Sequence, residues 1–234
     1  MNIKEYLSKL NNESQAIFSN SLAFKDDLGE AHHLSACIYE FAENIKDQFE
    51  RDIIIAVCSQ LESATLNASL GMYRQAFTSL RLSLEMGLGA VYFSAHKLEL
   101  QEWLNGKTDI KWSLLIDENN GVLSVRFSNA FFKEFSHDIT NYRKRASVIY
   151  RKLSEFVHGN HETWIKSGLK LEYNKKLLES YFNMVVEVSK IILYVLSCRY
   201  LKSFSRIDLE SLEFIQEEMG HLSYIREFFE GPKD

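Results

Sequence analysis

Four polar side chains between residues 151 and 158 have the types and spacing needed for acid–base chemistry on a phosphate: Arg151, Ser154, Glu155 and His158. The planar guanidinium of an arginine suits phosphate oxygens. A histidine titrates near neutral pH and can transfer a proton. On a helix, an arginine and a histidine seven positions apart project side by side. These are the parts needed to cleave RNA without a metal ion, with Ser154 as an additional hydrogen-bonding group.

The helix expected to position them spans residues 139–158 and has two faces. At 100° per residue, its apolar side chains gather on one side as a predicted core face: Tyr142, Ala146, Ile149, Leu153 and Phe156. The four polar residues lie opposite, toward solvent, a groove or a partner, and Gly159-Asn160 ends the helix. A second interpretation stays open, in which Arg151 and Glu155 form an ordinary surface ion pair and His158 interacts with the helix dipole.

Other polar residues could support this group. Arg81 and Glu85 lie four positions apart in an apolar helix. If they are buried, they must pair with each other or with the His158 region, and a structural ion pair is the favoured interpretation. His161 follows the glycine and could reach the same cleft. His32-His33 has no carboxylate at ligand spacing, so we expect neither a metal site nor a cofactor. The sequence also lacks a glycine-rich phosphate loop and the GxSxG and HExxH motifs.

These residues resemble the signature of the HEPN superfamily (higher eukaryotes and prokaryotes nucleotide-binding domains). In that signature an arginine, four to six variable residues and a histidine lie near the end of a helix. The segment "RKLSEFVH", from Arg151 to His158, has six intervening residues. The segments "LSEFVHG" and "YRQAFTSLRLSLEMGL" are also similar to parts of bacterial HEPN-like proteins. The resemblance covers roughly residues 30–200 in helix order and pattern.

The resemblance implies an HEPN-like helical bundle that acts as a homodimer, with two such helices facing each other across one composite cleft. It implies a metal-independent endoribonuclease in which Arg151 holds the phosphate and His158 transfers the proton. Attack by the 2′-hydroxyl then leaves a cyclic phosphate. The family's usual setting is phage defence or a toxin–antitoxin system, so an antitoxin or another operon protein is an expected partner. The candidate supporting residues are Ser154, Glu155, His161, Arg81 and Glu85.

One position departs from the family pattern. Active HEPN nucleases usually carry Asn, Asp or His directly after the arginine, where this chain has Lys152. Several HEPN-like families bind without cleaving. The alternative prediction is therefore a non-catalytic helical binding module or regulatory subunit that engages a protein partner. A purely structural helical dimer is a third interpretation.

Composition indicates the fold class. The 234-residue chain has 10 glycines and one proline, Pro232, so long helices can run without a break. With 46% hydrophobic residues it can bury a core, and we predict an all-α fold. A net charge of −5 argues against a general nucleic-acid-coating protein. Residues 142–176, however, carry nine Lys or Arg against three Glu. This indicates either a basic belt for an anionic ligand such as RNA or a solvated surface.

Cysteine spacing and hydropathy bear on the compartment. The three cysteines lie far apart, so we expect reduced, buried thiols in a cytoplasmic protein. The N-terminal residues lack an apolar signal core. The most apolar segment, residues 184–201, contains Glu187 and Lys190. We expect it to be a core helix and not a membrane span.

We predict a single helical domain over residues 1–234, with a core bundle at about 30–204 and additional C-terminal helices at about 206–230. The expected elements are a helix over 2–10, an irregular segment over 11–29, a helical stretch over 30–70 with a bend near Arg51, a helix boundary at Ser69–Gly71, helices over 139–158 and 174–204, a helix over 209–219 capped by Ser205 or Asp208, and a last helix after Gly220.

Residues 97–137 have two interpretations. The segment "DENNG" could turn a hairpin between "IKWSLLI" and "VLSVRF". It could equally separate two short helices, the first capped by Thr108. We favour helices, because a lone hairpin is only marginally stable in an otherwise helical chain.

Overall fold

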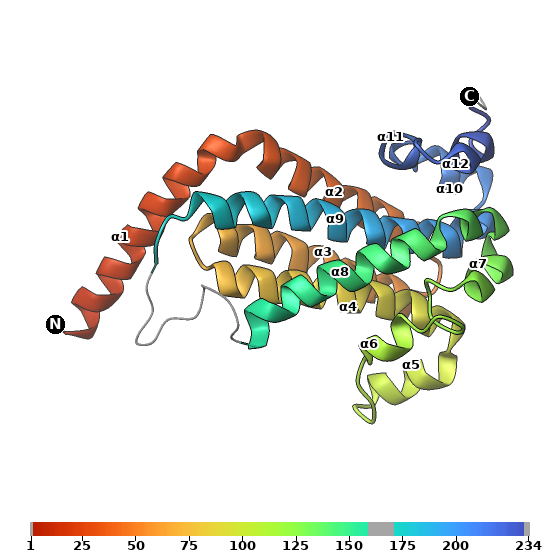
Figure 1. Cartoon of the computed structure of the whole chain (residues 1–234), viewed down its shortest axis with the longest axis horizontal. Coiled ribbons are helices and arrows are strands. Elements are labelled where there is room, and N and C mark those ends of the chain that lie inside the picture. Colours follow the sequence, from red (N-terminus) through yellow and green to blue (C-terminus); the bar gives the residue numbers. More distant parts are fainter. Residues whose placement is uncertain (1, 159–170, 232–234) are drawn as a thin grey trace.

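The computed structural model describes residues 2–158 and 171–231, and every regular element in these ranges is a helix (Figure 1). The all-α prediction is therefore confirmed. The α-helices are α1 (Ile3–Ser21), α2 (Lys25–Glu43), α3 (Gln48–Ser69), α4 (Tyr73–Ala95), α5 (Lys97–Leu104), α6 (Trp112–Leu115), α7 (Val125–Phe131), α8 (Ile139–His158), α9 (Lys175–Tyr200), α10 (Arg206–Glu210), α11 (Phe214–Met219) and α12 (Ser223–Phe228). The 3-10 helices are η1 (Leu22–Phe24), η2 (Lys133–His137) and η3 (Leu201–Ser203).

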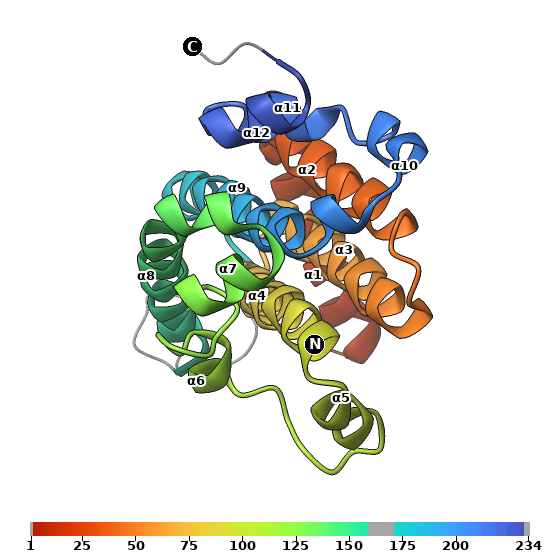
Figure 2. The same cartoon turned by 90° about the vertical axis from the view of Figure 1, so that its right-hand side faces the viewer.

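Helix α9 is the central element of the bundle and contacts α2, α3, α4 and α8 (Figures 1 and 2). Its residues from Ile191 to Cys198 are all buried, so this part of the helix is enclosed on every side. Within the described ranges, the span Lys175–Ser203 is the one helix long and apolar enough to cross a membrane, with a mean hydropathy of 1.4. Since 72% of its apolar window is buried by the other helices, that surface is already covered by the bundle.

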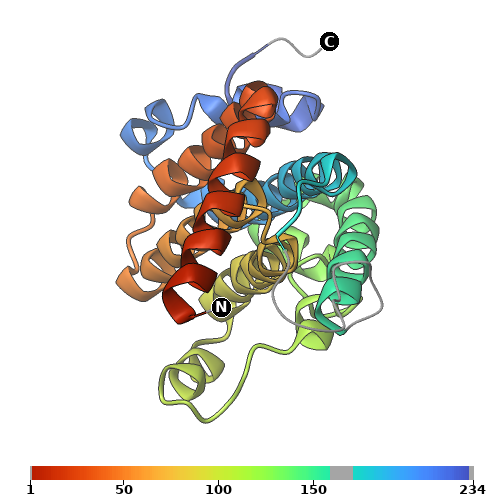
Figure 3. The ribbon, with the colours of Figure 1, turned by 90° about the vertical axis from the view of Figure 1, so that its left-hand side faces the viewer.

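The N-terminal region is more helical than its sequence pattern predicts. Residues 11–21, expected to be irregular, continue α1, and α2 follows directly after η1. The side chains of Asn2 and Glu5 form a capping box at the start of α1. The hydroxyls of Ser19 and Ser21 each donate to a carbonyl four residues earlier, so these serines are accommodated within a helix. Helix α1 lies along the outside of the bundle (Figure 3), and its residue Ile17 is buried. The prediction of an irregular segment is wrong.

Short connections join α2, α3 and α4. The prediction of one helical stretch with a bend near Arg51 is wrong, because two separate helices meet at a break before that residue. Helix α2 ends at Glu43, and Asp47 caps the separate helix α3 by accepting a hydrogen bond from the backbone of Glu50. The boundary predicted at Ser69–Gly71 is confirmed. Gly71 has a φ of 81°, the left-handed conformation that favours glycine after a helix end.

Residues 97–137 form helices and turns, so the helical interpretation is confirmed and the hairpin is not formed. The "DENNG" segment makes a turn in which the Asp117 carboxylate accepts from the backbone N–H groups of Asn119 and Asn120. The cap predicted at Thr108 is wrong. Helix α6 begins at Trp112, four residues after Thr108, and the side chain of Lys111 before it makes no capping bond. Ser124 caps α7 by accepting from the backbone of Phe127.

The C-terminal helices cover one end of the bundle. Ser205 caps α10 in a capping box with Asp208, as predicted. The single helix predicted over 209–219 is wrong, because a turn separates α10 from α11. The Asn44 amide donates to Ser211 at 3.0 Å and ties this region to the end of α2. The ring centroid of Tyr224 lies 4.9 Å from that of Phe135, and this contact adds apolar packing from α12.

Candidate functional site

The predicted core face of α8 is confirmed. Tyr142, Ala146, Ile149, Leu153 and Phe156 are all buried. The ring of Phe156 stacks on that of Phe77 from α4, with 3.7 Å between ring centroids and 22° between ring planes. This contact fixes the rotation of α8 at the end that carries the candidate residues.

The opposite face of α8 presents the predicted polar residues outward. Arg151, Glu155 and His158 are exposed, and Ser154 is half-buried. The Ser154 hydroxyl donates to the carbonyl of Tyr150 at 2.7 Å, within the helix. Arg151 and Glu155, both in the described part of the chain, do not form the ion pair that their spacing allows. The guanidinium of Arg151 and the imidazole of His158 are therefore open to solvent, on one face and at one helix end.

The basic belt is partly neutralised. Arg143 donates to Glu118 at 3.0 Å. Arg145 makes two hydrogen bonds to Glu187, at 2.7 and 2.8 Å. Those hydrogen bonds raise the pKa of Arg145 above its ordinary value, so this guanidinium stays charged and engaged. The exposed cations left on α8 are Lys144, Arg151 and Lys152. On α8, the positive surface available to a ligand thus narrows to the side of the helix that carries Arg151.

Arg81 and Glu85 form a pair that ties α4 to α8. Arg81 donates to Glu85 at 3.1 Å and to the Tyr150 hydroxyl at 2.6 Å. The Tyr150 ring stacks on Trp112 of α6, 3.8 Å between centroids and 3° from parallel. Burial and the nearby Glu85 carboxylate raise the pKa of Tyr150. The side chains of Arg81 and Glu85 are 17% and 21% exposed, which makes them a mostly buried structural pair.

This pair is not brought to His158. Tyr150 precedes His158 by two helical turns, or about 12 Å along α8. The Nε of Arg81 is buried and has no hydrogen-bond partner within the described ranges. The predicted supporting residue His161, the glycine stop and the loop after it lie outside the described residues.

A second group of reactive side chains was not predicted. Nε2 of His33 lies 3.5 Å from the Cys37 sulfur and 3.3 Å from a Glu218 oxygen. Nε2 is the nitrogen closer to the sulfur, and Nδ1 lies 4.0 Å from the same sulfur, so the ring does not sit between the thiol and the carboxylate with one nitrogen toward each. Burial, with Glu218 nearby, raises the pKa of the Cys37 thiol to about 12, which opposes thiolate formation. The His-x3-Cys spacing on α2 was the available sequence signal, and the geometry favours a structural role. The residues described contain no cluster of His, Cys, Asp and Glu able to hold a metal ion.

No protein-family model matches the chain, and comparisons with curated proteins and with solved structures found no match either.

Proposed function

We propose that the protein is an HEPN-like RNA-targeting endoribonuclease that acts as a dimer without a metal ion, in a defence or toxin–antitoxin setting. The observation that carries the proposal is the placement of Arg151 and His158 on the same helix face. Both side chains are exposed on one face at the end of α8, and neither is used in an ion pair within the described ranges. The resemblance in "RKLSEFVH" supplies the choice of RNA as substrate.

In the proposed reaction, Arg151 binds the non-bridging oxygens of the scissile phosphate and neutralises the charge that builds up in the transition state. The 2′-hydroxyl of the preceding ribose attacks phosphorus, and the bond to the 5′-oxygen breaks. His158 in its protonated form donates a proton to that leaving oxygen. His158 lies in the last turn of α8, on the same face as Arg151, so both side chains can meet one phosphate. The products are a 2′,3′-cyclic phosphate and a 5′-hydroxyl.

A dimer supplies the missing base. One α8 offers a single histidine, whereas the reaction needs one group to donate a proton and another to accept the proton of the 2′-hydroxyl. Two copies of α8 related by a twofold axis would place a second His158 across the cleft. Val148 is 56% exposed on the polar side of α8, and it is an apolar residue that such an interface would bury.

The alternative is a binding module without catalysis. The residue that favours this alternative is Lys152. It is exposed directly after Arg151, where active HEPN nucleases usually have Asn, Asp or His. A lysine at this place adds charge for holding RNA or an acidic protein partner, but it is none of those three side chains.

The test uses the purified full-length protein, mixed tRNA and mRNA, and a chelator in the buffer. Wild type is expected to release fragments ending in 2′,3′-cyclic phosphate, and Arg151→Ala and His158→Ala are expected to lower the rate at least 100-fold. His32→Ala is the matched control, because that imidazole is 74% exposed on α2, away from α8. If wild type binds RNA but leaves it intact, the binding module is favoured. If wild type neither binds nor cleaves RNA, and its expression does not slow growth, the proposal is overturned.

A further inference from the structure

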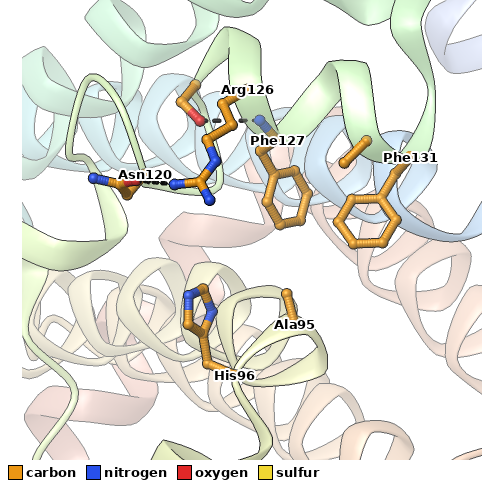
Figure 4. Close-up of a pocket in the computed structure, with 8 residues that line it drawn as sticks. Ala95, His96, Asn120, Arg126, Phe127 and Phe131 are labelled. Carbon is orange, nitrogen blue, oxygen red and sulfur yellow. Dashed lines mark hydrogen bonds between the residues drawn. The ribbon is translucent and has the colours of Figure 1, made fainter.

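A pocket of about 330 Å³ lies between the end of α4 and helix α7 (Figure 4). Its volume is at the lower end of the range for small-molecule sites. The pocket is lined by Ala95, His96, Asn120, Ser124, Arg126, Phe127, Ala130 and Phe131. These residues come from α4, the "DENNG" turn and α7, so none of the sequence motifs singled out for chemistry predicted it.

The polar end of the pocket is formed by His96 and Arg126. The His96 ring stacks on Tyr92, 3.9 Å between centroids and 8° from parallel. Its Nδ1 lies 2.9 Å from the carbonyl oxygen of Tyr92. A carbonyl only accepts, so Nδ1 carries the proton, and Nε2 is left without a partner among the described residues. Figure 4 shows this ring rising from α4 toward Arg126 and Phe127.

Arg126 is a cation without a carboxylate partner in the described part of the chain. Its guanidinium donates instead to the side-chain oxygen of Asn120 (Figure 4). That amide orients the guanidinium but leaves its charge unneutralised. An arginine held in this way has the further donors needed to bind a carboxylate or phosphate with two parallel hydrogen bonds.

The other end of the pocket is an aromatic wall. The ring centroids of Phe127 and Phe131 lie 4.7 Å apart, with 51° between the ring planes. Phe131 is held by Arg199 of α9, whose guanidinium carbon lies 4.3 Å from the ring centroid. Arg199 is itself fixed by a 2.7 Å hydrogen bond to Ser94. The wall is therefore preformed, and it offers a surface for a flat apolar ligand body.

We propose that this pocket binds a small aromatic anion. The anionic head group pairs with Arg126, and the aromatic body lies against Phe127 and Phe131. Carboxylates and phosphates share the chemistry that the polar end recognises, so the head group can be either.

The pocket is separate from the site of the proposed function. Helix α4 runs antiparallel to α8, because Phe77 contacts Phe156 and Arg81, one turn later on α4, contacts Tyr150, which precedes Phe156 on α8. Ala95 and His96 thus lie toward the start of α8, whereas His158 is its last residue. The 20 residues of α8 span about 30 Å. The proposed ligand does not depend on the RNA-cleavage proposal, and either can fail alone.

The probes are 2-naphthoate, 1-naphthyl phosphate and the neutral 2-naphthamide, titrated into the full-length protein by calorimetry. We expect the better of the two anions to bind with a dissociation constant on the order of 0.1 mM. The amide should bind at least tenfold more weakly, since it lacks a charge-assisted contact. Amide chemical shifts in the NMR spectrum should change at Ala95, Phe127 and Phe131 in the presence of the anion. Whichever anion binds more tightly identifies the head group.

Two variants test the site. Arg126→Gln should weaken anion binding about tenfold while the amide is unaffected. Ala95→Phe, at an exposed position on the pocket wall, should abolish binding of all three probes without loss of helicity. Lys133→Gln is the matched control, because this exposed cation on η2 does not line the pocket and should change the dissociation constant less than twofold. The proposal is overturned if neither anion binds at 5 mM (about fifty times the expected constant), if the amide binds as tightly as the anions, or if Arg126→Gln binds like wild type.

Discussion

The contact between Arg81 and Tyr150 provides a quantitative test of how α8 is held. Tyr150→Phe removes one hydroxyl and keeps the ring that stacks on Trp112 at 3.8 Å. A hydrogen bond to a charged group contributes about 1.5–3 kcal/mol to stability. The Arg81 side chain is 17% exposed, so water can replace part of the lost contact. We therefore expect the lower end of that range, a loss of about 1.5 kcal/mol in the free energy of unfolding, or about 3–6 °C in Tm.

A double-mutant cycle separates this hydrogen bond from its surroundings. Arg81→Met should cost about 2–3 kcal/mol, because it also removes the partner of the mostly buried Glu85. The double variant should cost less than the sum of the single variants by about 1–1.5 kcal/mol. The measurement is urea unfolding followed by circular dichroism. Tyr39→Phe is the control, at a tyrosine 45% exposed on α2, and should change stability by less than about 0.5 kcal/mol. A coupling energy below about 0.5 kcal/mol would refute the assignment of Arg81 as the residue that holds α8 through Tyr150.

Further predictions concern the core. Gly71→Ala should lower the free energy of unfolding by about 1–3 kcal/mol, since a Cβ there meets Ile17 at 2.8 Å in a left-handed backbone; Gly29→Ala, at an open helical site, should not destabilise. Tyr194→Phe should cost about 0.5–1.5 kcal/mol, because the Phe135 carbonyl loses its 2.8 Å donor and keeps only the backbone N–H of Asp138 at 3.2 Å; equal stability in urea unfolding would contradict this. Burial raises the pKa of each cysteine thiol to about 12, so a thiol reagent at pH 8 should label none in the native protein and all three after denaturation. Rapid labelling of the native protein would show that the thiols are not buried.

The face of α8 could be predicted because its signal is periodic. Five apolar residues recur at spacings of three and four between Tyr142 and Phe156, and all five are buried. This regularity depends only on local geometry. The same holds for the end of α3, where a glycine after Ser69 marks a conformation that other residues avoid.

Local signals failed where contacts distant in sequence decide the structure. Serines and asparagines over residues 11–21 are typical of turns, but Ser21 donates to the carbonyl of Ser69, 48 residues away, as well as to its own helix. The sequence places basic residues throughout the belt at 142–176. Arg143, however, is neutralised by Glu118, 25 residues away, and Arg145 by Glu187, 42 residues away. No spacing rule connects such positions.

The pocket beside α7 was missed for the same reason. Its cation follows a turn that the sequence allowed to be a hairpin, and its histidine ends a helix 30 residues earlier. Neither residue belongs to a sequence motif that indicates a binding site. Only the packing of α7 beside the end of α4 places His96 and Arg126 at one opening.

The central place of α9 has a consequence for the order in which the chain becomes stable during synthesis. The carboxylate of Glu50, early in α3, accepts a hydrogen bond at 2.7 Å from Tyr200, 150 residues later. At 5–20 residues per second, a ribosome needs roughly 8–30 s to make the intervening chain. Until α9 has been made, the apolar faces of α2, α3 and α4 lack the helix that covers them. The nascent chain should therefore be a substrate for chaperones that bind exposed apolar helices, and truncation before α9 should yield aggregation-prone protein.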